Sequence, residues 1–322
     1  MHTIINTVNR VLAPFHLAIF RFDLQAQTSF QAPFTSIPYR GALGHALRRI
    51  SCRQPGENCP DCDLASHCAY GYIFETTPSR DATHARKFSS FPRPYVINTP
   101  AGFGRLLSPG DNFGFDLTLI GHAVAGLPAV VAAFEEIGAG EGLGPGGGKF
   151  KVRQVCQYLP GGEIPVYTGD TFGNFAPPFD FGEIPDSSTP VNQVTLRLLT
   201  PLRLDIRGKL LQDAPSFRVL METLLRRLLL TNYLHCGGEY LDPPEELLHQ
   251  TEAIAVAETE LHWQELDRHS SRQQKTMKMG GLRGHITYSG DLGPFVPLLR
   301  LGELLNIGKS TTDGLGRYRL EV

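Results

Sequence analysis

The pattern of hydrophobic and polar positions in the second half of the chain predicts a strand, a helix, a glycine-rich turn and a closing strand. Apolar and polar residues alternate over 282–288, as in a strand with one buried face. The apolar segment 295–305 lies close to prolines, which favour the first turn of a helix. Glycines then recur within 308–316, before the alternating segment 317–322.

The first half shows the same order of elements. Residues 113–120 alternate as a strand, and 127–137 favour a helix that begins near Pro128. Glycines recur from 138 to 148, and a basic strand is predicted over 149–155. We interpret this recurrence as an internal duplication.

The two halves also begin alike. A strand over 15–22 precedes a helix over 41–50, and a strand over 191–207 precedes a long helix over 216–235. Each half therefore has βαββαβ order, the ferredoxin-like plan. We predict an α+β protein of two tandem ferredoxin-like (RRM-like) domains, with a cysteine-rich insertion in the first.

The predicted boundaries follow changes in composition. An N-terminal domain is predicted over 1–158, with the cysteine-rich insertion at about 51–75. Residues 159–190 are dense in Pro, Gly and Phe and are interpreted as a linker. The C-terminal domain is predicted over 191–322, and its acidic segment 237–262 is interpreted as an insertion after the first helix.

The composition is that of a soluble globular protein. The 322 residues are 41% hydrophobic and 19% charged, which is enough for two domains. We expect a cytoplasmic protein without a membrane partner, since no apolar run reaches a span's length and no signal peptide is evident. Because the net charge is −2, RNA binding would depend on basic clusters, such as the arginines of 40–53.

The glycine-rich segment 308–316 is the most informative stretch. Its glycines allow a tight backbone with outward amides, which suits a phosphate, and Lys309 and Arg317 add positive charge. A P-loop is not predicted, because Glu303 stands where that motif needs glycine and the strand and helix are in reverse order. A turn without a ligand remains the alternative.

The segment 307–316 reads apolar-Gly, about five residues, then Gly-apolar-Gly before the final strand. With the motifs at 268–273, 279–284 and 297–302, it resembles the CRISPR-associated endoribonucleases of the RAMP superfamily that process precursor crRNA. The match is looser over residues 1–190. The resemblance implies an RNA partner and metal-independent cleavage, in which the ribose 2′-OH attacks the adjacent phosphate and leaves a 2′,3′-cyclic phosphate and a 5′-OH.

The same resemblance implies a histidine near the first helix of the N-terminal domain, and His45 stands there. We predict His45 as general acid or base, Tyr39 as a positioning or proton-handling hydroxyl, and Arg49, on the same helical face, as the phosphate-stabilising cation. No lysine accompanies His45, so the acid–base set is incomplete. A packing role for His45 remains open, and His269 is the alternative catalytic histidine.

The candidate RNA contacts are basic, polar and glycine residues in four clusters. They are Arg48, Lys149, Lys151, Arg268, His269, Ser271, Arg272, Lys275, Lys278, Gly308, Lys309, Ser310, Gly314, Gly316 and Arg317.

Four cysteines form a candidate metal site with the spacing Cys-x6-Cys-x2-Cys-x5-Cys: Cys52, Cys59, Cys62 and Cys68. Close thiols in a cytoplasmic chain more often hold a metal than form disulfides. We expect a structural zinc, with an iron–sulfur cluster or no metal as alternatives, and no catalytic metal.

Three functions remain in view from the sequence. The first is an endoribonuclease that cleaves CRISPR repeat RNA. The second is a non-catalytic RAMP subunit that holds RNA in a crRNA effector complex. The third is a metal-stapled structural protein whose glycine loops only turn the chain.

Overall fold

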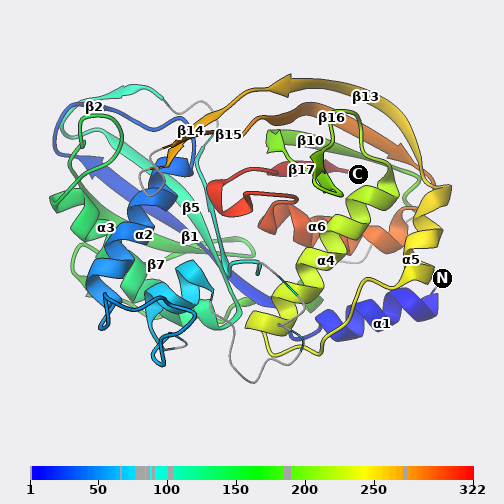
Figure 1. The fold of residues 1–322 in the computed structure, drawn as a ribbon, viewed down its shortest axis with the longest axis horizontal. Helices are drawn as coiled ribbons and strands as arrows, with labels where there is room; N and C mark the ends of the chain where they lie inside the picture. The colour runs from blue at the N-terminus through cyan, green and yellow to red at the C-terminus, as the bar shows by residue number, and fades with distance from the viewer. Residues whose placement is uncertain are drawn as a thin grey trace. The chain divides into compact units, whose positions relative to one another are not determined.

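Figure 1 shows the computed structural model, which describes residues 2–65, 67–76, 84, 88, 91–100, 104–184, 190–270 and 275–322. The chain divides into two compact units. The N-terminal unit comprises Phe15–Asp180 and Thr231–Gly237, and the C-terminal unit comprises Met1–Pro14, Phe181–Leu230 and Gly238–Val322.

The N-terminal unit is built on a ferredoxin-like sheet. Its principal elements are β1 (His16–Ala26), α2 (Ile37–Ser51), β3 (Tyr95–Asn98), β5 (Asn112–Ile120), α3 (Leu127–Ala139) and β6 (Phe150–Leu159). The strands lie in the order β3-β5-β1-β6, and neighbouring strands are antiparallel. The first strand of the βαββαβ series thus lies between the third and the fourth, which confirms the predicted plan for this half.

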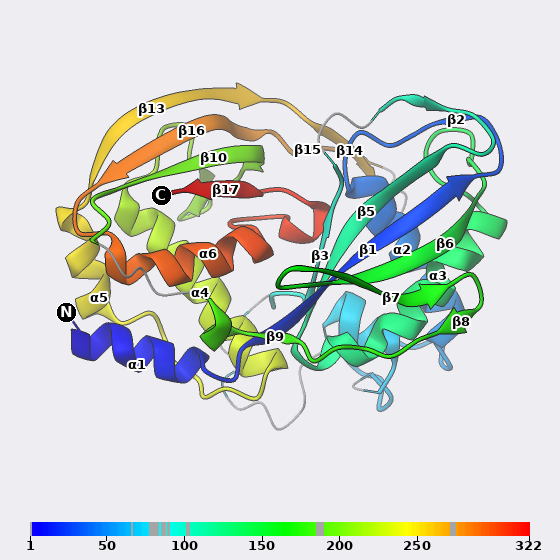
Figure 2. The ribbon, with the colours of Figure 1, turned by 180° about the vertical axis from the view of Figure 1, so that it is seen from behind.

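One face of this sheet forms the core of the N-terminal unit. Alternate residues of β1, including Phe20 and Phe22, are fully buried against α2 and α3, which cover the same face (Figures 1 and 2). The Phe22 ring stacks on Phe115 at 4.7 Å between centroids, and Phe115 meets Phe134 of α3 at 4.6 Å. The intervening β1 residues, such as Arg21, lie on the opposite face, which is polar.

The predicted linker is part of this sheet instead. The segment 159–190 carries β7 (Gly162–Thr168), β8 (Thr171–Phe172) and β9 (Phe179–Asp180). Strands β7 and β8 extend the sheet beyond β6, and β9 pairs with β1. A further short pair, β2 (Phe30–Gln31) with β4 (Leu106–Leu107), completes the strands of this unit.

The C-terminal unit repeats the plan. Its principal elements are β10 (Gln193–Leu202), α4 (Phe217–His235), β13 (Ala255–Gln264), β16 (Gly281–Ser289), α6 (Val296–Leu305) and β17 (Tyr318–Glu321). Their order in the sheet is β13-β16-β10-β17, again antiparallel throughout. Helices α4 and α6 lie on one side of the sheet, where Phe217 packs against Tyr288 and Phe295 with centroids 5.1 and 5.3 Å apart (Figure 2).

Two boundary predictions are wrong. The acidic segment 237–262 is not an insertion, because it contains α5 (Glu245–Gln250) and most of β13, the second strand of the ferredoxin-like series. The N-terminal helix α1 (His2–Leu12) groups with the C-terminal unit, so the N-terminal unit begins at Phe15.

The C-terminal unit also contains two separate hairpins, and its sheet contains a bulge. The hairpins are β11 (Asp205–Ile206) with β12 (Lys209–Leu210), and β14 (Asp267–Ser270) with β15 (Lys275–Lys278). The pairing of β10 with β16 is displaced between Leu198 and Leu202. The residues between them form a bulge that contains Pro201, which cannot donate a backbone hydrogen bond to the neighbouring strand.

The helical segment Gly121–Ala139 reaches the length and mean hydropathy of a membrane span, at 19 residues and 1.2. In this structure its apolar side chains, including Leu127, Val130 and Phe134, are part of the core of the N-terminal unit. We therefore interpret it as a core helix.

Candidate nucleic-acid interface

The glycine-rich loop, residues 307–316, is fastened to the bulge of β10. The amide of Lys309 donates to the Arg203 carbonyl at 2.8 Å, and the amide of Gly316 donates to the Pro201 carbonyl at 2.9 Å. The Thr200 hydroxyl donates to the Gly314 carbonyl at 2.7 Å and accepts from the Arg317 amide at 2.8 Å. Much of the polar backbone of the loop is therefore satisfied within the protein.

The glycines are required by close backbone packing. Gly316 has φ +71°, and a Cβ there would lie 1.8 Å from the Ile307 carbonyl oxygen. Gly308 has φ +90°, and a Cβ there would lie 2.4 Å from the Arg203 carbonyl oxygen. The prediction that these glycines mainly allow phosphate to approach open amides is therefore corrected, because they first allow two protein segments to approach each other.

A smaller part of the loop remains available to a ligand. The amides of Gly308 and Ser310 have no acceptor among the described residues, and both residues are partly exposed. Ser310 adopts a left-handed conformation with φ +61°, which turns the backbone sharply between the two anchored ends. Any anion contact in this loop is thus confined to its first turn.

The positive charge beside the loop is partly neutralised. The Lys309 ammonium lies 2.6 Å from the Asp205 carboxylate of the β11–β12 hairpin. This ammonium and the Gly208 amide lower the pKa of Asp205. Lys309 is therefore an exposed but paired cation in this structure.

Two arginines that sequence reasoning missed lie at the same bulge. Arg203 donates to the Gly280 carbonyl, and burial lowers the pKa of its guanidinium. Arg283 of β16 donates to the Leu199 carbonyl at 2.6 Å. No local pattern marks Arg203, and Arg283 lies in the motif 279–284 without a predicted role, because only the strand pairing brings both to the bulge.

The β14–β15 hairpin carries a second predicted cluster. The register pairs Arg268 with Met277 and His269 with Thr276, so the backbone of this motif is a regular hairpin. Ser271 and Arg272 lie outside the described residues, as do the side chains of Arg268, His269 and Lys275. Lys278 is exposed at the end of the hairpin that joins β16.

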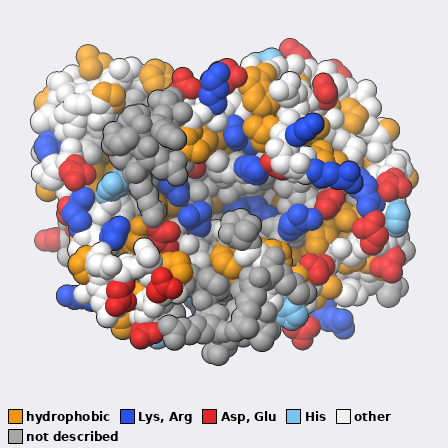
Figure 3. All heavy atoms as spheres, in the orientation of Figure 1, with side chains coloured by type: hydrophobic (Ala, Val, Ile, Leu, Met, Phe, Trp, Pro, Cys, Tyr) orange, Lys and Arg blue, Asp and Glu red, His pale blue; other side chains and the backbone are white. Residues whose placement is uncertain are grey.

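Figure 3 shows how charge is distributed on the face drawn there. On the C-terminal unit, Lys and Arg side chains gather over the region of β17 and α6, whereas Asp and Glu side chains concentrate toward α5. In the second region Arg218 pairs with Glu245 and with Glu252, the latter at 2.9 Å. Positive and negative side chains of this unit are therefore separated on this surface.

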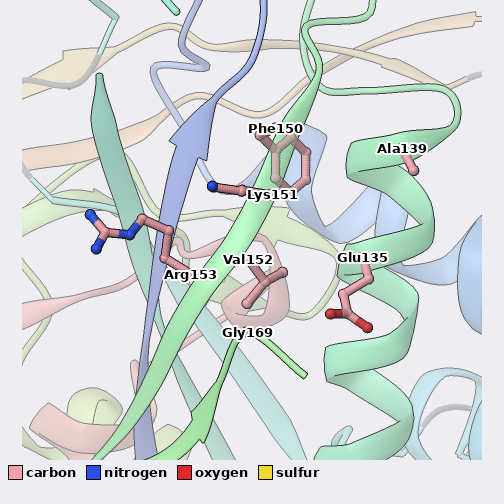
Figure 4. Close-up of a pocket in the computed structure, with 7 residues that line it drawn as sticks. All are labelled: Glu135, Ala139, Phe150, Lys151, Val152, Arg153 and Gly169. Carbon is pink, nitrogen blue, oxygen red and sulfur yellow. The ribbon is translucent and has the colours of Figure 1, made fainter. Parts of the chain in front are cut away.

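The N-terminal unit has a basic strip along β6. Phe150 and Val152 are buried, so the alternating residues Lys149, Lys151 and Arg153 belong to the opposite, polar face of the sheet. Figure 4 shows Lys151 and Arg153 extending from β6 on the side away from α3. With Glu135 these cations line a cavity of about 310 Å³, which therefore contains both signs of charge.

This face offers few aromatic surfaces for bases. Along β1 and β5 its described residues include Arg21, Asp23, Gln25 and Asp116, and Arg21 pairs with Asp116 at 3.3 Å. A typical RRM presents aromatic rings at such positions. The composition of the face favours contact with an RNA backbone over stacking of bases.

His45 lies on the exposed face of α2. Tyr39 and Arg49, the two residues predicted to act with His45, are in environments that do not suit those roles. Tyr39 is fully buried, where its ring lies 5.1 Å from that of Phe115, and burial raises the pKa of its hydroxyl well above the usual value. Arg49 donates to both carboxylate oxygens of Glu136 of α3, at 2.9 and 2.8 Å, and to Glu141 at 3.0 Å.

These positions correct the predicted roles of Tyr39 and Arg49. A fully buried hydroxyl with a raised pKa is neither accessible to a substrate nor suited to move a proton near neutral pH. The Arg49 guanidinium already binds two carboxylates, and the three groups together carry a net negative charge, which does not favour a phosphate. Arg48 is also engaged, since it donates to the Pro55 carbonyl at 3.1 Å and lies 5.9 Å above the Tyr70 ring.

The four cysteines follow α2 and line one cavity of about 210 Å³ together with His67 and Gln54. Burial, together with the nearby Glu75 carboxylate and the Cys68 and Cys52 thiols, raises the pKa of Cys59. Among the described residues no three His, Cys, Asp or Glu side chains stand at the mutual spacing of a bound ion. The thiols are therefore neighbours without forming a closed coordination shell in this structure.

Two family models match the sequence. Residues 15–178 match a family described as an N-terminal domain, and residues 196–318 match the CRISPR-associated endoribonuclease Cas6. The similarity to Cas6 is therefore carried by the C-terminal part of the chain. No curated protein sequence matches it at a significant level.

Solved Cas6 structures share the fold. A Cas6 product complex has a TM-score of 0.54 and 15% identity, covering 95% of this chain and 100% of that one. The Thermus thermophilus Cas6 has a TM-score of 0.53 and 13% identity, covering 95% of this chain and 99% of that one. Identities this low establish the fold and leave the activity to experiment.

Chains of a Cas6-RT-Cas1–Cas2 complex are also similar, with a TM-score of 0.54 and 15% identity. The match covers 95% of this chain but only 46% or 29% of those chains. The present sequence thus spans less than half of those multidomain proteins.

Proposed function

We propose that this protein is an endoribonuclease that cleaves CRISPR repeat RNA in precursor crRNA. The observation that carries the proposal is the match of the C-terminal ferredoxin-like unit to the Cas6 family, over residues 196–318. An exposed histidine on the first helix after β1 supports the assignment, because general acid–base cleavage needs such a group within reach of the RNA.

The reaction that we propose is attack of a ribose 2′-OH on the adjacent phosphorus, with loss of the 5′-oxygen of the next nucleotide. The products are a 2′,3′-cyclic phosphate and a 5′-OH, and no metal ion takes part. His45 would take the proton of the 2′-OH or give one to the departing oxygen. We assign Arg49 to positioning, since its contacts with Glu136 and Glu141 join α2 to α3.

The cationic contacts with RNA would come from both units. In the C-terminal unit these cations would be Lys309 of the glycine-rich loop and Arg203 and Arg283 at the β10 bulge, to which that loop is hydrogen-bonded. In the N-terminal unit, the β6 strip supplies Lys149, Lys151 and Arg153. Such contacts recognise backbone shape, and they make affinity depend on salt.

A second candidate is a RAMP subunit that holds RNA without cutting it, in a crRNA effector complex. The observation that favours it is the state of the predicted catalytic set, because Tyr39 is buried and Arg49 is paired with carboxylates. His45 would then have no described partner for charge stabilisation. The two candidates predict the same RNA binding and differ only in cleavage.

The decisive experiment is incubation of the purified chain with 5′-labelled CRISPR repeat RNA in EDTA. We expect cutting at one position, with a 2′,3′-cyclic phosphate and a 5′-OH at the new ends. The matched control is the same RNA with a single 2′-deoxy nucleotide at the cleavage site, which should bind equally and resist cutting. Binding without cutting would establish the non-catalytic subunit. If the chain neither binds nor cuts the RNA, the metal-stapled structural protein is the function that remains.

The Asp205–Lys309 pair gives a prediction about affinity. Asp205→Asn should raise affinity for repeat RNA roughly two- to fivefold at about 0.1 M salt, because it frees one ammonium while an amide oxygen can still accept from Gly208. Titrations by filter binding at several salt concentrations measure this change.

The control for that prediction is the double variant Asp205→Asn with Lys309→Ala, in which the gain should disappear. An equal gain with and without Lys309 would show that the carboxylate repels RNA directly. No change in either variant would place this loop outside the RNA contact surface.

A further inference from the structure

The cysteine-rich segment has an unusual pattern of burial. Among the described residues from Arg53 to His67, every one is exposed except Cys59, Cys62 and Ala65. Cys52 and Cys68, at the two ends, are partly buried as well. The four thiol-bearing residues therefore turn inward, while nearly all of their neighbours face solvent.

The segment has little else to hold it in place. Its described residues between 52 and 68 form turns, bends and irregular backbone. Ala65 is its single buried apolar residue, and Leu64 is 42% exposed. Ordering so many residues costs conformational entropy that this small apolar contact does not offset.

The contacts that the thiols make are weak. The Cys62 thiol donates to the Gln54 side-chain oxygen at 3.0 Å, and the Cys68 thiol reaches the Ser51 carbonyl at 3.7 Å. All four cysteines are free, and all line the same cavity. Thiols that converge on one space without bonding to one another are the donor set of a soft metal.

We propose that Cys52, Cys59, Cys62 and Cys68 hold one metal centre through their thiolates, with Zn²⁺ as the expected ion. Binding replaces four S–H protons by four S–metal bonds, and the protons pass to solvent. The turns between the cysteines let the sulfurs close to the roughly 2.3 Å at which zinc binds thiolate. Arg53 at the cavity and Arg48 beside the Pro55 carbonyl offset the resulting negative charge.

Such a centre would be structural. Four protein ligands leave no position for water or substrate, so the metal would not act in RNA cleavage. It would join Cys52, at the end of α2, to Cys68, just before the turn Tyr70–Glu75. The metal would thereby fix the C-terminal end of the helix that carries His45.

The test begins with the unmodified full chain, purified without chelator under reducing, oxygen-free conditions. We expect about one zinc per chain by elemental mass spectrometry. Titration with an organomercurial, which forms S–Hg bonds with the four thiolates in place of their S–Zn bonds, should release that zinc, measured with a colorimetric zinc indicator. Iron with acid-labile sulfide and visible absorbance would support the same ligand set with a cluster in place of zinc.

Variants identify the ligands. Cys59→Ser and Cys62→Ser should each lower bound metal at least tenfold, and they should lower the melting temperature. Cys156→Ser is the matched control, because Cys156 lies in β6 outside the cavity and should retain the metal. If a variant fails to fold, metal release from the unmodified chain still gives the answer.

Two results would overturn the proposal. One is a folded chain with less than about a tenth of a metal per molecule that also fails to bind added Zn²⁺ or to be rebuilt with iron and sulfide. The other is a Cys59→Ser and Cys62→Ser double variant that keeps its full metal content. Neither depends on RNA cleavage, so the outcome is separate from that of the proposed function.

Discussion

Replacing His45 by alanine should slow cleavage of repeat RNA by a factor on the order of 10² or more, as expected on loss of a positioned acid or base. RNA affinity should stay within about twofold, because an exposed imidazole supplies little of the binding surface. The side chain is exposed on α2, so the variant should keep its melting temperature. Single-turnover cleavage rates and binding titrations on the same preparation measure both quantities.

The matched control is His249→Ala, which removes another exposed histidine. His249 lies on α5 within 3.3 Å of a Glu252 oxygen and has no role in the proposed chemistry. It should cleave at the normal rate. A His45→Ala protein that also cleaves normally would contradict the assignment, and His269→Ala would then become the variant to measure.

Replacing Gly316 by alanine should destabilise the C-terminal unit by about 2 kcal/mol or more. A non-glycine residue at φ +71° is itself strained, by about 1 kcal/mol or more, and the new Cβ would press on the Ile307 carbonyl. The loop would have to leave the β10 bulge or distort. Thermal melting and urea denaturation of the full chain measure the loss, and RNA affinity should fall with it.

Gly208→Ala separates the two causes. Gly208 also has a left-handed backbone, with φ +84°, but a Cβ there meets no atom within 4 Å. It should lose only the roughly 1 kcal/mol of backbone strain. Equal losses in the two variants would show that the close approach of Gly316 to Ile307 contributes nothing.

The ferredoxin-like plan could be predicted because the core strands alternate strictly. Phe20, Phe22 and Leu24 on β1 are buried, and the residues between them are polar. A period of two with a following helix leaves few other arrangements. The internal duplication could be predicted for the same reason, because the alternation recurs in the strands of the second half.

Strand β13 could not be found in this way. Its residues from Ala255 to Glu260 are all exposed, and three of the ten are glutamate or histidine at the central positions Glu258, Glu260 and His262. An edge strand that is exposed on both faces has no hydrophobic period, and charge there discourages pairing with other chains. For this reason the sequence alone favours an insertion over 237–262 and not a strand of the sheet.

The candidate site was predictable only in part. Helical spacing predicts that His45 and Arg49 share a face of α2, and both are exposed there, but it could not decide the direction of Tyr39 at the start of the helix. The sequence predicts that Arg49 contacts phosphate, because nothing near it in the chain shows that it has a carboxylate partner. That partner, Glu136, lies 87 residues away, and only the packing of α2 on α3 brings the two side chains together. Long-range pairing of this kind leaves no local trace in a sequence.

The placement of α1 with the C-terminal unit has a consequence for biosynthesis. Its buried residues Ile5, Val8 and Leu12 belong to a unit whose other parts begin at Phe181. As the ribosome makes the chain, the N-terminal unit can form most of its sheet before the residues that α1 packs against have been translated. Nascent protein would therefore carry an uncovered apolar face of α1 until the ribosome has translated the residues that follow Phe181, and a fragment that starts at Phe181 would lack this helix.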